Sequence, residues 1–297
     1  MNVRSGLLVL FSLCALGLSS VVFAQDHSAH QGMNMNMDMG SGNTTIRFSA
    51  RVGDSDVSCG IMYESLGSHN SEVELTDFRL YISNVRLINA EGEEVPLELT
   101  QDEMWQHDNV ALLDFEDGSA GCADSGNAML NTKIVGSSPD GEYTGLVFDL
   151  GVPDEMNHMD TTTAPTPLNI AAMWWGWQGG YKFLRVDMMA DGKPWFIHLG
   201  STGCESPNEA TAPESPCSSP NRVEVRMGSF NAAHNFVVVN LDSLVSDIDL
   251  STSVPEPPGC MSFSGDPDCA PIFKNLGLAL DNGTPLPDVV QTLFSTQ

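Results

Sequence analysis

Basic side chains are scarce in this sequence, which has 12 lysines and arginines against 39 aspartates and glutamates. The formal net charge is −27 at pH 7. Binding to nucleic acid depends on Lys and Arg side chains that neutralise phosphates, and attraction to anionic lipid surfaces depends on the same side chains. The composition therefore argues against both classes of partner. A negative surface instead attracts cations and basic partners.

Long apolar runs are missing after residue 24, and a membrane-spanning helix needs about 20 such residues. We therefore expect no membrane insertion. The early apolar run covers residues 7–22, follows Arg4 and ends at the small-x-small pattern Val22-Phe23-Ala24. This arrangement is typical of a secretory signal peptide. We expect residues 1–24 to be removed after Ala24 and the remaining chain to be periplasmic or secreted.

Motifs of common enzyme classes are also absent. The sequence has no Gly-x-Ser-x-Gly elbow, no phosphate-binding P-loop, no Gly-x-Gly-x-x-Gly, no His-Glu-x-x-His and no calcium loop of the EF-hand type. It has no Cys-x-x-Cys either, so neither a thioredoxin-like site nor covalent c-type haem is encoded. These absences favour a binding protein over an enzyme.

Of the seven cysteines, Cys14 lies in the signal peptide, and an even number remains for the exported chain. An even number in an exported protein predicts disulfide bonds, although the count alone does not decide the pairing. Short loops favour two local bridges and leave a third pair over. The pairs are Cys204 with Cys217, Cys260 with Cys269, and Cys59 with Cys122.

Residues 25–43 form a tail with almost no large apolar side chains apart from methionine, so we expect it to be disordered. Thioether and imidazole groups suit Cu(I), which predicts weak metal binding by the tail. The alternative is a linker of biased composition without function. The candidate ligands are His27, His30, Met33, Met35, Met37 and Met39.

Alternating apolar and polar residues predict many short strands, including a long half-buried strand over 75–87 with a bulge near Asn84. Turn residues predict hairpins around 91–93 and 191–193. The pattern indicates an all-β protein, an antiparallel β-sandwich or a partly open barrel, with long disulfide-stapled loops and a few short helices. Residues 251–297 form a Pro- and Gly-rich C-terminal extension, with helical segments expected at 271–280 and near 288–294.

Three of the five tryptophans lie at positions 174, 175 and 177, between Met173 and a glycine pair. Large aromatic side chains are usually core anchors, but such a cluster could also form a stacking platform for carbohydrate. His158 precedes the cluster, and His198 follows it on a predicted strand where it shares a face with Phe196. A single histidine is usually a structural, hydrogen-bonded residue.

Four motifs surround the tryptophan cluster and the two histidines. They are Asn157-His158, Ala164-Pro165-Thr166-Pro167-Leu168-Asn169, Trp175-Gly176-Trp177-Gln178-Gly179-Gly180-Tyr181 and His198-Leu199-Gly200-Ser201-Thr202-Gly203-Cys204. With residues 77–85 and 111–116, they resemble the MbnP family over roughly residues 44–250. These are methanobactin-associated copper-binding proteins, also known as metallo-mystery pair four-Cys proteins.

The resemblance implies one Cu(I) site and a role in copper homeostasis. Binding in the family depends on oxidation of the first tryptophan of a Trp-x-Trp motif to kynurenine, which here is Trp175. The oxidant is a partner protein, a dihaem cytochrome c peroxidase of the MauG type. The family's four cysteines correspond to Cys59, Cys122, Cys204 and Cys217.

The expected ligand set is the modified Trp175 with His158, His198 and Met173, because imidazole and thioether groups suit Cu(I). Met156 and Met159, which flank His158, are further candidates. An unmodified indole N–H is a donor only and a poor ligand. The alternative interpretation is a carbohydrate-binding or structural exported β-sandwich whose tryptophans form an aromatic platform or core.

Overall fold

The computed structural model describes residues 41–123, 128–253 and 257–297. The expected signal peptide and the histidines and methionines of the tail lie outside these ranges. Residues 41–43, expected to be the disordered end of that tail, instead begin strand β1. Residues 39–297 form one compact unit. Across the described ranges, no helix combines the length and apolar character needed to cross a membrane.

The smaller of the two main sheets has the order β18–β16–β1–β9–β6, with β2 paired to β1. Strand β16 lies between β1 and β18, as its continuous apolar run predicts, and pairs with β1 in parallel through Phe48 opposite Val237. The strands of this sheet are β1 (Ser41–Val52), β2 (Ser55–Asp56), β6 (Glu98–Leu99), β9 (Lys133–Pro139), β16 (Val237–Asn240) and β18 (Phe294–Thr296).

The larger sheet is built around one long strand, β4. Its main path is β15–β10–β4–β13–β14–β17, with β3, β5 and β8 also paired to β4, and β7 paired to β8. The strands are β3 (Met62–Leu66), β4 (Ser71–Asn89), β5 (Glu94–Pro96), β7 (Gln106–His107), β8 (Val110–Asp114), β10 (Tyr143–Leu150), β13 (Leu184–Ala190), β14 (Lys193–Leu199), β15 (Val223–Met227) and β17 (Gly259–Cys260).

Strand β4 changes partner along its length, and a bulge marks the change. Its first half pairs with β13 and its second half with β10. The register shifts between Ser83 opposite Asp149 and Arg86 opposite Val147, so two residues of β4 face one of β10. Asn84 adopts a φ of 51° there, and its side-chain amide donates to Asp149 Oδ2 at 2.8 Å. The predicted bulge is confirmed.

The middle of β4 differs from its expected half-exposed character, because residues 77–83 are buried on both faces. One face packs into the core between the sheets. Loop 151–180 covers the other, where the Tyr81 hydroxyl donates to Pro167 O at 2.9 Å and its ring meets Tyr181 edge-on. Charged side chains on this strand, Asp77 and Arg79, are therefore buried.

The core between the sheets includes a row of three aromatic rings. Phe148 of β10 meets Phe48 of β1 at 5.9 Å and Phe294 of β18 at 5.1 Å between ring centroids, both edge-on. Phe294 lies in the segment where a helix was expected near 288–294. That prediction was wrong, because Phe294 begins a strand that pairs with β16, Leu293 and Phe294 are buried in the core, and Val289 and Val290 are exposed.

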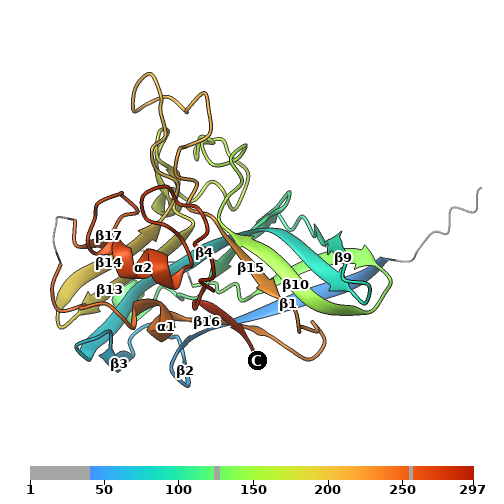
Figure 1. Cartoon of the computed structure of the whole chain (residues 1–297), viewed down its shortest axis with the longest axis horizontal. Coiled ribbons are helices and arrows are strands. Elements are labelled where there is room, and N and C mark those ends of the chain that lie inside the picture. The colour runs from blue at the N-terminus through green and yellow to red at the C-terminus, as the bar shows by residue number, and fades with distance from the viewer. Residues whose placement is uncertain (1–40, 124–127, 254–256) are drawn as a thin grey trace, which may run out of the picture. The chain divides into compact units, whose positions relative to one another are not determined.

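Residues 251–297 contribute to both sheets. Strand β17 pairs in parallel with β14, and β18 pairs with β16. Helix α2 (Cys269–Asn275) overlaps the segment expected to be helical, 271–280, but begins two residues earlier and ends at Asn275, and the Cys260–Cys269 disulfide ties it to β17. Figure 1 shows α2 beside β14 and β17, with the short helix α1 (Leu241–Val245) near β16.

The all-β fold is confirmed, and it is a sandwich of mainly antiparallel strands. The predicted hairpins form, with Leu87 opposite Val95 and Met188 opposite Trp195. Two short 3-10 helices, η1 (Ala120–Cys122) and η2 (Ala171–Met173), lie in the loops. The disulfides join the two pairs that short loops favoured, Cys204–Cys217 and Cys260–Cys269, and the pair left over, Cys59–Cys122.

Replacing Phe148 with Ala should test how much the aromatic row contributes to stability. Phe148 is 0 % exposed and contacts the second sheet through two rings, so we expect Phe148→Ala to lower the free energy of unfolding by about 3–5 kcal/mol. Phe263 is 61 % exposed, and the same substitution there should change it by less than about 0.5 kcal/mol. Urea unfolding measures both. Equal losses in the two variants would contradict this view of the core.

Candidate functional site

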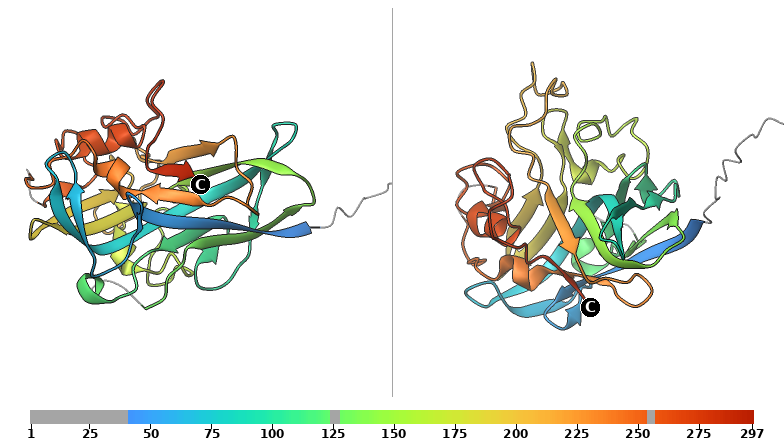
Figure 2. Two further views of the ribbon diagram at one scale, coloured as in Figure 1. Left: turned by 90° about the horizontal axis from the view of Figure 1, so that it is seen from below. Right: turned by 45° about the vertical axis from the view of Figure 1, so that its right-hand side comes forward.

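Two long loops meet at one end of the larger sheet. One covers residues 151–180 and the other residues 200–222. Figures 1 and 2 show them, in yellow-green and gold, projecting together beyond the strands. His158 of the first loop lies 3.4 Å from the sulfur of Cys217 in the second. The disulfide from Cys217 to Cys204 holds the second loop closed. The tryptophan cluster lies within the first loop.

Trp175 is held in a two-stranded hairpin of β11 (Trp174–Gly176) and β12 (Gly180–Tyr181). Its ring lies so close to Gly200 that a Cβ atom at residue 200 would be 2.4 Å from Cζ3. The half-buried ring also lines a cavity of about 530 Å³. The other walls of that cavity are Gln178, Gly179, Ser201, Thr202, Gly203, Cys204, Pro257, Met261 and Phe263.

His198 of β14 is 9 % exposed and approaches Trp175 from the sheet, with 6.5 Å between the ring centroids. It stacks on Phe196, as the shared face of the strand predicts. Its Nε2 lies 2.7 Å from Asp187 Oδ1. An ionised carboxylate only accepts hydrogen bonds, so Nε2 carries the proton and Nδ1 keeps a lone pair.

Electrostatics keep this pair as a neutral imidazole beside an ionised carboxylate. Burial lowers the pKa of His198 and outweighs the opposing effect of Asp187. Burial alone would raise the pKa of Asp187, but hydrogen bonds from His198 and Arg185 lower it to about 2. At neutral pH, the Nδ1 lone pair of His198 is therefore available to a ligand.

His158 is a half-buried residue that meets the tryptophan segment from the other side. Its Nδ1 lies 3.0 Å from the carbonyl oxygen of Trp177, which can only accept, so Nδ1 carries the proton. Nε2 then accepts from Asn157 Nδ2 at 3.2 Å. The amide orientation is fixed, because Asn157 Oδ1 accepts from Tyr181 N. Burial lowers the pKa of His158, so this ring is also neutral.

The two histidines contact the tryptophan segment at different points. His198 lies beside the ring of Trp175, and His158 bonds the backbone carbonyl of Trp177. Within the described ranges, two groups of at least three His, Cys, Asp or Glu side chains have their ligand atoms within 4.8 Å of one another. One contains His158, Cys204 and Cys217. The other contains Cys59, Glu116 and Cys122. The sulfurs of both groups are in disulfides, so they offer no thiolate.

The candidate methionine ligands differ in burial. Met173 is fully buried in the main core, and its carbonyl oxygen accepts from Lys182 N at 2.8 Å. Met156 and Met159 are partly buried against the same core. Met173 ends the 3-10 helix η2. A role for these thioethers in metal binding stays a prediction.

Trp174 and Trp177 pack against each other edge-on, with ring centroids 5.7 Å apart and an angle of 76° between the ring planes. They therefore do not form a flat surface of the kind on which a sugar ring stacks. Trp174 Nε1 is buried without a hydrogen-bond partner among the described residues. A packing role for these two residues agrees with this geometry.

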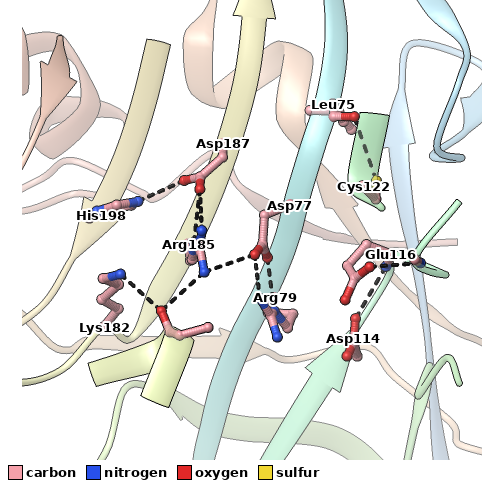
Figure 3. A network of polar contacts seen from close by, with 12 residues as sticks. Leu75, Asp77, Arg79, Asp114, Glu116, Cys122, Lys182, Arg185, Asp187 and His198 are labelled. Carbon is pink, nitrogen blue, oxygen red and sulfur yellow. Dashed lines mark hydrogen bonds and ion pairs between the residues drawn. The ribbon is translucent and has the colours of Figure 1, made fainter. Parts of the chain in front are cut away.

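A buried cluster of four charged residues lies behind His198 (Figure 3). Asp77 and Arg79 alternate along β4, and Arg185 and Asp187 alternate along β13. The strand register places like charges opposite each other, Arg79 with Arg185 and Asp77 with Asp187. Attraction therefore acts along each strand and diagonally, with Arg79 and Asp77 paired, Arg185 and Asp187 paired, and Arg185 Nη1 3.0 Å from Asp77 Oδ2.

Reasoning from sequence did not assign any role to this cluster. The available signal was the matched pattern Asp77-x-Arg79 and Arg185-x-Asp187 on two predicted strands. Alternating charges on a strand usually indicate a solvent-exposed face, and the sequence gives no indication that loop 151–180 covers it. Gly200, whose missing side chain makes room for Trp175, could be recognised only within the quoted family motif.

A second acidic pair adjoins the same cluster at the end of β8. Glu116 N donates to Asp114 Oδ1 at 3.2 Å, and both residues face Arg79. Burial, with the negative charge of Glu116, raises the pKa of Asp114 to about 7. This carboxyl therefore changes charge near neutral pH inside the fold.

Comparison with known proteins places the chain near one family. The MbnP family model matches residues 41–262. The solved structure of MbnP from Methylosinus trichosporium is 34% identical to this chain, with a TM-score of 0.78. That similarity covers 86% of this chain and 98% of the other. No curated protein matches the chain.

Adding a methyl group at Gly200 should displace Trp175. The new Cβ would also lie 2.7 Å from Tyr181 O, so we expect Gly200→Ala to lower the free energy of unfolding by about 1–3 kcal/mol and to change the near-ultraviolet circular dichroism of the tryptophans. Gly228→Ala is the control, because a methyl group at residue 228 would have nothing within 4 Å. Unchanged spectra and stability for Gly200→Ala would contradict the close contact.

Asp114 should make the fold less stable as the pH rises. Its folded pKa of about 7 lies above the ordinary 3.8, so its contribution is fully present below about pH 4 and is lost as the pH rises through 7. We expect the stability of Asp114→Asn relative to the parent chain to rise by up to about 3 kcal/mol between pH 5 and pH 8. Urea unfolding at both values measures this, with the exposed Asp54→Asn as control. A difference that does not change with pH would exclude this titration.

Proposed function

The chain belongs to the MbnP family, and we propose that it is a periplasmic copper-binding protein with one Cu(I) site beside Trp175. The observation that carries this proposal is the neutral imidazole of His198, which keeps a lone pair on Nδ1 and whose ring centroid lies 6.5 Å from that of Trp175. The role that follows is in copper homeostasis. The site binds and holds the metal, and the chain itself is not an enzyme.

The donor set of the described residues fits copper. A histidine that ligates a metal usually donates its other N–H to a carboxylate or a backbone carbonyl, which fixes the ring and its tautomer. His198 does so to Asp187, and His158 does so to the carbonyl of Trp177. Neutral imidazole suits Cu(I), and the thioether of Met173 stays a predicted third donor.

The surroundings of His158 also favour a cation. His158 lines a cavity of about 250 Å³, separate from the one that Trp175 borders, and its acidic neighbours attract positive charge. With the histidines neutral, these carboxylates supply the nearest negative charge in that cavity. They are Asp154, Glu155 and Glu214.

Trp175 as encoded is a poor ligand, so the proposal includes its oxidation to kynurenine. Two oxygen atoms add across the C2–C3 bond of the indole and break it, giving N-formylkynurenine. Hydrolysis then releases the formyl carbon as formate and leaves an aromatic amine and a ketone that can bind the metal. Two molecules of peroxide would each supply one oxygen atom and leave as water.

The oxidant is proposed to be a dihaem cytochrome c peroxidase of the MauG type, acting on this chain as its substrate. The ring of Trp175 borders an open cavity, so an external oxidant can act on it without unfolding the protein. Trp174 and Trp177 pack on each other beside it, which leaves Trp175 as the tryptophan of the cluster that contacts His198.

Co-expression with and without the dihaem partner tests this function. With the partner, we expect peptide mass spectrometry to find Trp175 oxidised and metal analysis to find about one copper per chain, the single site proposed. Without the partner, we expect unmodified Trp175 and little copper. Trp175→Phe should abolish copper retention, and His198→Ala should weaken it while leaving oxidation in place.

The matched control is His234→Ala, because His234 is an exposed histidine outside the site. It should bind copper as the parent chain does. Protein from its native periplasm that carries unmodified Trp175 and no copper would refute the proposal. Full copper retention by His198→Ala would refute the ligand assignment alone.

A further inference from the structure

We propose that Arg185 is a positioning residue that holds both halves of the site in place at once. It acts on His198 through Asp187 and on the tryptophan segment through the carbonyl oxygen of Ala172. The inference rests on the proposed function, in which His198 and Trp175 belong to one copper site. It adds a residue that would touch neither the metal nor the modified side chain.

The guanidinium of Arg185 serves three acceptors. Its Nε donates to Asp187 Oδ2 at 2.9 Å, and its Nη1 donates to Ala172 O at 3.1 Å and lies 3.0 Å from Asp77 Oδ2. Figure 3 shows Arg185 at the centre of these contacts. The other oxygen of Asp187 remains free to accept from His198. One planar group therefore fixes the carboxylate that orients the imidazole.

The contact with Ala172 reaches the second half of the site. Ala172 is the middle residue of η2, and β11 with Trp174 and Trp175 follows directly. Lys182 Nζ donates to the same carbonyl oxygen at 2.9 Å. Two cations, Arg185 on β13 and Lys182 just before that strand, thus anchor the turn from which the Trp175 strand begins.

The residues that hold Arg185 in place are themselves fixed. Asp77 is fully buried, and Arg79 binds it through Nε at 2.8 Å and through a second guanidinium nitrogen. Arg185 is therefore set against a carboxylate that has little freedom to move. Because His198 and Ala172 depend on the same guanidinium, a shift of Arg185 would move the imidazole and the tryptophan turn together.

Lysine cannot take this role. Arginine presents five N–H donors in a fixed plane, whereas lysine presents a single ammonium on a flexible stem. An ammonium could keep one or two of the three acceptors but not the fork on Asp187. Arg185→Lys therefore keeps the positive charge but loses the fixed planar arrangement of donors on Asp187, so it separates the effect of geometry from that of charge.

A merely structural role for Arg185 would lower stability without moving the imidazole. The deciding readout is therefore the pair of 15N resonances of the His198 ring in the metal-free protein, which report the tautomer. In Arg185→Lys we expect the single Nε2–H tautomer to become a mixture. After co-expression with the dihaem partner, we expect copper affinity to fall by about 10–100-fold, as for other residues that orient metal ligands.

Arg86→Lys is the matched control. Arg86 also serves three carboxylates, those of Glu94, Asp149 and Glu224, and it lies on β4. It is seven residues beyond Arg79, or about 20 Å along an extended strand. This control should leave both the His198 resonances and the copper affinity unchanged.

A folded Arg185→Lys protein with parental His198 resonances and parental copper affinity would overturn the inference. If Arg185→Lys does not fold, Asp187→Asn decides, because its amide can donate to Nε2 and move the proton to Nδ1. An unchanged tautomer in that variant would also overturn the inference. If the parent chain binds no copper with its partner, the proposed function fails, while the resonances of the metal-free protein still decide whether Arg185 orients His198.

Discussion

The ion pairs between β4 and β13 are the interaction on which the rest of the site depends. Charged side chains in the interior of a protein are tolerated only when each has partners, and removing one partner typically costs about 3–5 kcal/mol. Here two acids and two bases satisfy one another in a square formed by the buried Asp77, Arg79 and Asp187 and the partly buried Arg185. The square retains one unused acceptor, and that acceptor orients His198. This hydrogen bond holds the proton of His198 on Nε2, so the lone pair on Nδ1 stays available to a ligand.

Much of the fold could be predicted from local patterns, because strand alternation and turns depend on residues that are close together in the sequence. The hairpin of β13 and β14, the bulge at Asn84 and the pairing of short-loop cysteines all follow from such local rules. What failed depends on distant parts of the chain. The helix expected near 288–294 does not form, and Phe294 at its end instead begins a strand on the edge of β16, while the burial of Asp77 depends on a loop about ninety residues later.

The candidate site could also be predicted only in part. The family motifs pointed to His158, Trp175 and His198, and the structure explains the chemistry of each. Each imidazole has its proton fixed by an acceptor, a carboxylate for His198 and a peptide carbonyl for His158. The acceptors that hold these imidazole protons cannot be recognised from the local sequence, since any carbonyl oxygen can accept such a hydrogen bond. Arg185 and Asp187 were visible only as alternating charges on a strand.

The cavity in front of Trp175 has walls of different origin. Trp175, Gln178 and residues 200–204 come from the two loops that carry the site, whereas Pro257, Met261 and Phe263 come from the C-terminal segment. The family match ends at residue 262, inside that segment. Phe263 lies just beyond the matched residues, so a substitution there can reshape the entrance to Trp175 without changing either imidazole or the charges that support His198.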